Sequence, residues 1–264
     1  MAFSDEELIA ICNTYTDDSV RAQNKKNILY GKKWCACGDS FTCGDFYGYI
    51  DPEGHTGHES DAYDPVMGMY KTYPWWIAKR NNMTLTMLAE IGNDFTNISG
   101  ATRPFSKNTS SKNYTQIPAD ADYVTIWFGL NEYNLTAEQI GTKSDTTNAT
   151  LWGAYNVVFS SILNNNPLAK IGVFISDGNV ANQTIPQEYH DALIDICKYW
   201  AIPYLDLRNG LNIPMGLGGR LDECSSTSRT KRKEAFQVTP SNAHPNAKAH
   251  EYRSTFIENF LRTL

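Results

Sequence analysis

The sequence predicts an α/β fold built on a parallel β-sheet. Short, almost continuously apolar segments, as expected for strands buried on both faces, alternate with longer segments that have helical amphipathic spacing. The predicted strands are residues 34–37, 85–89 or 95–98, 123–128, 171–175 and 202–205. Such alternation forms βαβ units with right-handed crossovers, which bring the carboxyl ends of the strands to one edge of the sheet. Functional side chains are therefore expected at this edge.

The segments between and after these strands have the spacing of helices, at residues 64–81, 152–163, 186–200 and 247–264. The first contains Pro74, which is compatible only with the start or a bend of a helix. The last repeats aromatic residues at helical spacing, at Tyr252, Phe256 and Phe260. Residues 51–63 are polar and residues 213–241 are rich in Gly, Ser and Thr, so both are predicted loops that could wall a site.

The bulk properties favour one large domain and argue against several kinds of partner. With 264 residues, the chain is long enough for a domain at residues 30–264, preceded by a helical extension at residues 1–29. The net charge is −6 and basic residues form only one short run, at 229–233, so no nucleic-acid partner is expected. The chain has no signal-peptide pattern and no apolar stretch near the ~20 residues of a membrane helix. We therefore expect a soluble chain without membrane insertion, from a bacterial or bacteriophage source.

Polar motifs stand at the predicted strand ends. Gly38-Asp39-Ser40 follows the first strand, and His244 precedes the last helix. A serine hydroxyl is a weak nucleophile and needs a base within hydrogen-bond reach, for which His244 is the best candidate. The backbone N–H groups of Ser40 and Gly100 and the side-chain amide of Asn131 could stabilise a tetrahedral oxyanion. Each motif alone is an ordinary turn, but together they supply the parts of an acyl-transfer site.

These motifs, in this order, resemble those of the SGNH hydrolases, also called GDSL esterases and lipases, from about residue 30 to the end of the chain. The resemblance implies that Ser40 is the nucleophile, that Ser40, Gly100 and Asn131 form the oxyanion hole, and that His244 is the base. It also implies a flavodoxin-like three-layer α/β/α sandwich with a five-stranded parallel sheet. The expected activity is ester hydrolysis through an acyl-enzyme, with no cofactor and no metal.

One position departs from the family pattern. Ser241 stands three residues before His244, where the family usually has an aspartate. In serine proteases, neutralising the corresponding acid costs about four orders of magnitude in turnover. Three interpretations stay open: a backbone carbonyl orients His244 in a Ser–His dyad, Asp222 or Glu223 from the preceding loop is the third member, or the chain is a weakened relative that binds without cleaving.

Two other groups of residues suggest a metal site and disulfides, respectively, and both have simpler explanations. His55, His58, Asp61 and Asp64 have ligand-like spacing, but polar residues in a polar loop usually face water, and a role in lining the substrate cleft is favoured over a metal site. The six cysteines include no Cys-x-x-Cys pair, and Cys35 and Cys37 fall on the same side of a strand. Free, mostly buried thiols are therefore predicted.

The substrate is the least constrained part of the prediction. Tyr and Trp residues are frequent around the polar loops, which suits sugar rings, and no apolar lid or acyl groove is visible. The resembled family includes many polysaccharide deacetylases, so O-deacetylation of a carbohydrate or polysaccharide is the favoured activity. A lysophospholipase or thioesterase-type lipid esterase and a carbohydrate-binding relative are the alternatives. The candidate substrate-binding residues are Asp39, Tyr133, His55 and His58.

Overall fold

The computed structural model describes residues 26–45, 49–50, 56–57, 62–98, 100–132, 134–176, 179–180, 183–207, 227, 231, 235–239 and 242–264. The predicted extension at residues 1–29 thus lies almost entirely outside the described residues. None of the helices in the described ranges is long and apolar enough to cross a membrane.

A five-stranded parallel sheet forms the centre of the fold. Its strands are β1 (Lys33–Gly38), β6 (Thr84–Ala89), β7 (Tyr123–Trp127), β8 (Lys170–Ile175) and β11 (Tyr204–Asp206), in the order β11-β8-β7-β1-β6. Along the chain, the first strand of this sheet, β1, lies inside it, and the second, β6, lies at its edge. The third, β7, lies on the other side of β1, so the direction in which strands are added reverses between β1 and β7. Open α/β sheets place ligands at such a switch point, beyond the carboxyl ends of the strands.

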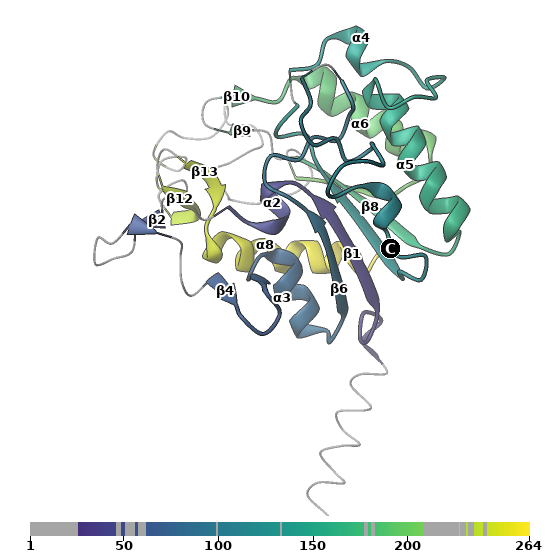
Figure 1. Cartoon of the computed structure of the whole chain (residues 1–264). Helices are drawn as coiled ribbons and strands as arrows, with labels where there is room; N and C mark the ends of the chain where they lie inside the picture. Colours follow the sequence, from purple (N-terminus) through teal and green to yellow (C-terminus); the bar gives the residue numbers. More distant parts are fainter. Residues whose placement is uncertain are drawn as a thin grey trace, which may run out of the picture.

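Two layers of helices cover the sheet (Figure 1). Helices α3 (Tyr73–Arg80) and α8 (Ala247–Leu261) pack against each other on one face, and α5 (Leu151–Asn165) and α6 (Gln187–Tyr199) lie on the other. The predicted three-layer α/β/α sandwich with a five-stranded parallel sheet is therefore confirmed. Of the two alternatives for the second strand, residues 84–89 form it, and the last strand begins two residues later than predicted.

Short elements complete the described structure. They are the helices α2 (Ser40–Cys43), η2 (Tyr114–Gln116) and α4 (Ala137–Ile140), and the antiparallel pairs of β2 (Tyr49–Ile50) with β3 (Thr56–Gly57), β4 (Tyr63–Asp64) with β5 (Met69–Tyr70), β9 (Asn179–Val180) with β10 (Gln183–Thr184), and β12 (Gln237–Thr239) with β13 (Asn242–Pro245).

Aromatic side chains fill the core on both faces of the sheet. Trp127 at the end of β7 packs against Tyr73 and Phe174, with ring centroids 5.5 and 5.9 Å apart. The next residue along the chain, Phe128, packs instead against Phe95, at 5.2 Å. Because successive side chains of an extended segment point to opposite faces, these neighbours anchor two separate aromatic clusters.

The helix predicted over residues 64–81 is wrong in its first half, where the β4–β5 hairpin forms instead. The carboxylate of Asp64 accepts the backbone N–H groups of Val66 and Met67, which stabilises a turn in competition with a helix. Gly68 adopts a φ of +65°, a left-handed conformation that also interrupts a helix. Pro74 lies in the first turn of α3, as its ring requires.

The contact between β8 and α8 yields a test of the packing. A Cβ atom on Gly172 would lie 2.8 Å from Cε1 of Phe260, so we expect Gly172→Ala to destabilise the protein by about 1–3 kcal/mol through overpacking. Urea unfolding measures this loss. In the Phe260→Leu background the smaller side chain should relieve part of it, and strictly additive losses in the double variant would contradict the contact.

Candidate active site

Ser40 lies at the carboxyl end of β1, where the strand turns sharply into α2. Asp39 is the N-cap residue of α2, and its Oδ1 accepts the N–H of Phe41 at 2.9 Å. A Cβ atom on Gly38 would lie 2.1 Å from Oγ1 of Thr42, so only glycine allows the helix to start this close to the strand. This tight turn places the Ser40 side chain at the switch point of the sheet.

His244 lies in β13 and meets Ser40 across the edge of the sheet. Its Nε2 is 2.7 Å from Oγ of Ser40, within reach for direct proton transfer. The imidazole ring packs against Phe41, with ring centroids 5.1 Å apart, and α8 begins just after β13 with Asn246 as its N-cap. The structure therefore brings together the two residues that the sequence proposes as nucleophile and base.

Asp45 is a third ionisable group at this contact. Its Oδ2 lies 3.8 Å from Nε2 of His244, and the two side chains are each about 20% exposed. Burial lowers the pKa of His244 below its usual value, and the Asp45 carboxylate partly opposes this by raising it. The carboxylate thus approaches the nitrogen that faces Ser40. Sequence reasoning missed Asp45, because nothing in the sequence marks it as functional except that it follows Gly44, the residue after α2.

The other predicted members of the site fall differently. Asp222, Glu223 and Ser241, the candidates for the third member of a triad, lie outside the described residues, as do Tyr133, His55 and His58. Asp39 is fully buried, which favours its role as a helix cap over the predicted contact with a substrate.

The candidate oxyanion donors come from three neighbouring loops. Gly100 adopts a φ of +98°, which a residue with a side chain rarely takes. Nδ2 of Asn131 donates to the carbonyl of Asn93 at 2.9 Å, and Nδ2 of Asn93 donates to the carbonyl of Gly38 at 3.3 Å. Within the described chain, no acceptor takes the backbone N–H of Ser40 or Gly100. The hydrogen bonds of Asn131 and Asn93 link the loop after β7 to the end of β1, the strand that leads to Ser40.

Glu132 fixes the same loops from behind. It is 6% exposed, and its Oε2 accepts both the N–H and the hydroxyl of Thr96, at 2.9 and 2.7 Å. These two bonds hold Glu132, and with it the adjacent Asn131, against the loop that leads to Gly100. Burial raises the pKa of Glu132 to about 7, although the bonds from Thr96 lower it, and burial likewise raises the pKa of Asp39 to about 7. Sequence reasoning missed Glu132, since a loop glutamate gives no sign of burial.

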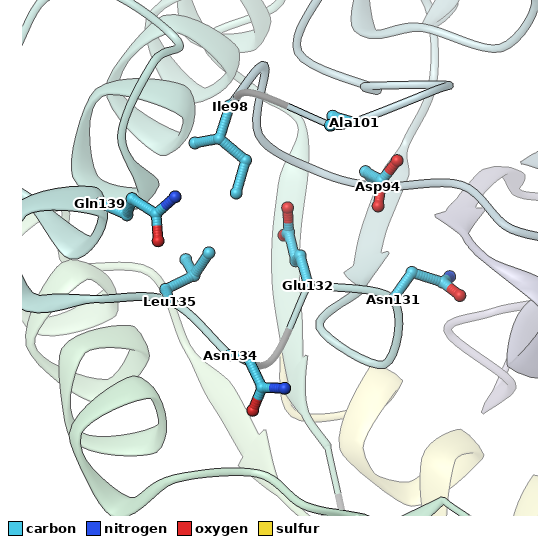
Figure 2. A pocket seen from close by; sticks show the side chains of 9 residues that line it. Asp94, Ile98, Ala101, Asn131, Glu132, Asn134, Leu135 and Gln139 are labelled. Carbon is cyan, nitrogen blue, oxygen red and sulfur yellow. The ribbon is translucent and has the colours of Figure 1, made fainter.

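A cavity of about 320 Å³ opens beside these donors. Its wall combines apolar and polar side chains from the loops after β6 and β7 and from α4 (Figure 2): Asp94, Ile98, Gly100, Ala101, Asn131, Glu132, Asn134, Leu135 and Gln139. The oxyanion candidates Gly100 and Asn131 therefore belong both to the site and to the cavity.

The clusters considered for metal binding and for disulfides have structural explanations where they are described. Asp64 accepts the indole N–H of Trp75 at 2.7 Å, whereas His55, His58 and Asp61 lie outside the described residues. Across the described ranges, no group of three or more His, Cys, Asp or Glu side chains could hold a metal ion.

The thiols that the structure describes are free, as predicted: Cys35, Cys37, Cys43 and Cys197. The Sγ atoms of Cys35 and Cys37 lie 3.7 Å apart on one side of β1. Cys12 and Cys224 lie outside the described residues.

The position of Asp45 predicts the direction of a pKa change. In Asp45→Asn the carboxylate that raises the pKa of His244 is lost while the burial that lowers it stays, so the pKa of His244 should fall. The neutral, basic form of the imidazole then persists to lower pH. NMR titration of the His244 ring protons measures this, with Asp195→Asn on the exposed side of α6 as the control. An unchanged or higher pKa would contradict the assigned contact.

Burial of Glu132 predicts how stability depends on pH. The pKa of about 7 in the folded state exceeds the ~4.3 of an unfolded glutamate, so the folded state binds the extra proton between these values. The contribution of Glu132 to stability is therefore complete below pH ~4 and is lost as the pH rises through about 7. Between pH 5 and pH 8 the free energy of unfolding should therefore fall less in Glu132→Gln than in wild type. The difference should be on the order of 2 kcal/mol, measured by urea unfolding at both pH values. An equal pH dependence in both proteins would argue against a buried, titrating Glu132, and Glu138→Gln on the exposed side of α4 serves as the control.

Comparisons with known proteins agree with this architecture. No protein-family model and no curated protein sequence matches the chain. A solved structure from Lactobacillus plantarum is similar with a TM-score of 0.59 at 17% identity, covering 89% of this chain and 98% of that one. A structure described as a GDSL-like lipase from Bacteroides uniformis gives 0.55 at 14% identity, covering 89% and 97%.

A family two carbohydrate esterase from Clostridium thermocellum, solved as an active-site mutant, gives a TM-score of 0.51 at 15% identity, covering 88% of this chain and 63% of that one. At such identities the likeness concerns the arrangement of helices and strands. The chain therefore has the fold of the SGNH hydrolases, the superfamily that its motifs resemble.

Proposed function

We propose that the chain is a serine ester hydrolase that acts on short-chain esters through an acyl-enzyme. The observation that carries this proposal is the 2.7 Å contact between Oγ of Ser40 and Nε2 of His244 at the carboxyl edge of the parallel sheet. A nucleophile within hydrogen-bond reach of a base is the arrangement that acyl transfer requires.

The steps follow from the positions of the side chains. Oγ of Ser40 attacks the ester carbonyl carbon while its proton passes to Nε2 of His244. The oxyanion accepts hydrogen bonds from the backbone N–H groups of Ser40 and Gly100 and from Nδ2 of Asn131. His244 then protonates the departing alcohol, and the acyl group stays on Ser40. A water molecule, deprotonated by His244, hydrolyses this ester and restores the free serine.

Asp45 supports the charged intermediate of this sequence. When His244 takes the serine proton, the imidazolium lies 3.8 Å from the Asp45 carboxylate, an attraction that the partly buried setting strengthens relative to bulk water. Asp45 therefore supplies part of the stabilisation that the family obtains from the aspartate position occupied here by Ser241. This favours an active enzyme over a relative that only binds.

Carbohydrate or polysaccharide O-acetyl esters are the substrate class we propose. The mixed wall of the cavity beside the oxyanion candidates, which includes the polar residues Asn134 and Gln139, does not suit the long alkyl chain of a lipid ester. The similarity in fold to a carbohydrate esterase supports the same choice. Acetate release from acetylated xylan or pectin, compared with hydrolysis of long-chain esters, tests it, and faster hydrolysis of long-chain esters would reject it in favour of a lipid esterase.

The catalytic assignment predicts that Ser40→Ala and His244→Ala each reduce kcat on p-nitrophenyl acetate by at least about three orders of magnitude. The losses should not add in the double variant, because the two residues act as one unit. Ser144→Ala, on the exposed surface, is the matched control and should keep wild-type turnover. Undiminished turnover in Ser40→Ala would reject Ser40 as the nucleophile.

A further inference from the structure

The cavity beside the oxyanion candidates is lined by residues other than the proposed nucleophile and base. Its lining residues come from the loop after β6, the loop after β7 and α4 (Figure 2), and they include the oxyanion candidates Gly100 and Asn131. Neither Ser40 nor His244 lines it, nor does any residue of β13. The cavity therefore shares Gly100 and Asn131 with the proposed oxyanion hole but is not lined by the proposed nucleophile or base.

The stereochemistry of acyl transfer indicates which part of an ester enters this space. In the tetrahedral intermediate the carbonyl carbon carries Oγ of Ser40, the oxyanion, the leaving oxygen and the acyl chain. The leaving oxygen must face Nε2 of His244 to be protonated, and the oxyanion faces Gly100 and Asn131. The acyl chain is the remaining substituent and points away from His244, toward the cavity that borders the oxyanion donors.

The volume exceeds what an acetyl group uses. At about 320 Å³ the cavity is much larger than the single methyl group that an acetyl ester would introduce. Ile98 and Leu135 provide apolar surface for a short carbon chain, and Figure 2 shows the Glu132 carboxylate between Ile98 and Asp94. A longer acyl group thus finds both apolar walls and polar groups.

Two of the polar groups are held in place by neighbouring residues. Oε1 of Gln139 accepts the N–H of Thr136 at 2.9 Å, in the capping box of α4, which leaves the Nε2 of the amide as the donor. Oε2 of Glu132 accepts two bonds from Thr96, and the hydroxyl of Tyr189 lies 3.5 Å from Oε1. The backbone N–H of Phe95 also lowers the pKa of this carboxyl group. Among the described residues, these donors leave part of the acceptor capacity of the carboxylate unused. A fixed donor and an acceptor with remaining capacity therefore line one cavity.

We propose that this cavity binds the acyl group of the substrate and selects short acyl chains that carry a hydroxyl. The inference rests on the proposed esterase function and extends its acyl range from acetyl to short hydroxyacyl groups. A hydroxyl can donate to Glu132 and accept from Gln139, whereas an ammonium group could only donate and an alkyl chain would leave both polar groups without a partner. Sites built to hydrogen-bond a substrate hydroxyl discriminate strongly against the analogue that lacks it.

The test compares p-nitrophenyl 3-hydroxybutyrate with p-nitrophenyl butyrate, so that the leaving group stays the same. Each kcat/KM is divided by the uncatalysed hydrolysis rate of that ester. Wild type should prefer one enantiomer of the hydroxy ester by about tenfold or more. The hydroxyl preference is the corrected kcat/KM of the hydroxybutyrate divided by that of the butyrate. Gln139→Leu should lower this ratio by about tenfold, because the donor is lost.

The controls separate recognition from folding. Gln116 occupies the equivalent capping-box position of η2 and does not line the cavity, so Gln116→Leu should keep the wild-type ratio. Leu135→Trp, which fills the cavity, should reduce hydrolysis of both butyrates relative to the acetate. This second variant reports on the cavity even if Gln139→Leu does not fold.

The outcomes distinguish this inference from the proposed function. A wild-type ratio near or below one, or a ratio unchanged in Gln139→Leu, overturns the selection of hydroxyacyl groups while acetate hydrolysis dependent on Ser40 would uphold the esterase. Failure to hydrolyse any of these esters would overturn the esterase, and the acyl cavity with it.

Discussion

The contact between Ser40 and His244 depends on a parallel sheet that brings together residues 204 positions apart. Neither residue is placed by its own local sequence alone. Ser40 is positioned by the end of β1 and the cap of α2, and His244 by the strand that precedes α8. Because both segments end at the same edge of the sheet, the proposed nucleophile and base meet there. The rest of the site is arranged around this edge.

A network of hydrogen bonds joins the three loops that carry the proposed oxyanion donors. Asn93 connects Gly38 to Asn131, and Glu132 connects the same loop to Thr96. Burial disfavours the charged forms of Asp39 and Glu132, consistent with their raised pKa values, so holding these loops with ionised carboxylates costs some stability. Preorganised donors of this kind contribute to catalysis because they do not reorganise as charge develops.

Much of the fold could be predicted from the sequence because the central strands are nearly continuous apolar runs. The correct choice between two second strands could not, since Phe95 is as apolar as a strand residue but packs in an aromatic cluster with Phe105 and Tyr155. The hairpin at residues 63–70 was missed because the side chain of Asp64 forms its turn. Local side-chain bonds of this kind override periodicity.

The candidate site could be predicted in part. The sequence displays the features that mark four of its residues: Ser40 and Asn131 follow predicted strand ends, position 100 is a glycine, and His244 precedes a predicted helix. Asp45 and Glu132 could not be found in this way, because their importance lies in contacts with His244 and with Thr96. The cavity is formed by two loops separated in the sequence, so its volume and lining emerge only from the folded chain.

Covalent trapping tests the central claim most directly. A serine-directed organophosphate such as paraoxon phosphorylates a serine hydroxyl much faster when a base activates it. Intact-mass and peptide mass spectrometry should find a single adduct, on Ser40, formed by wild type and not by His244→Ala. An adduct on another residue, or equally fast labelling of Ser40 without His244, would contradict the account.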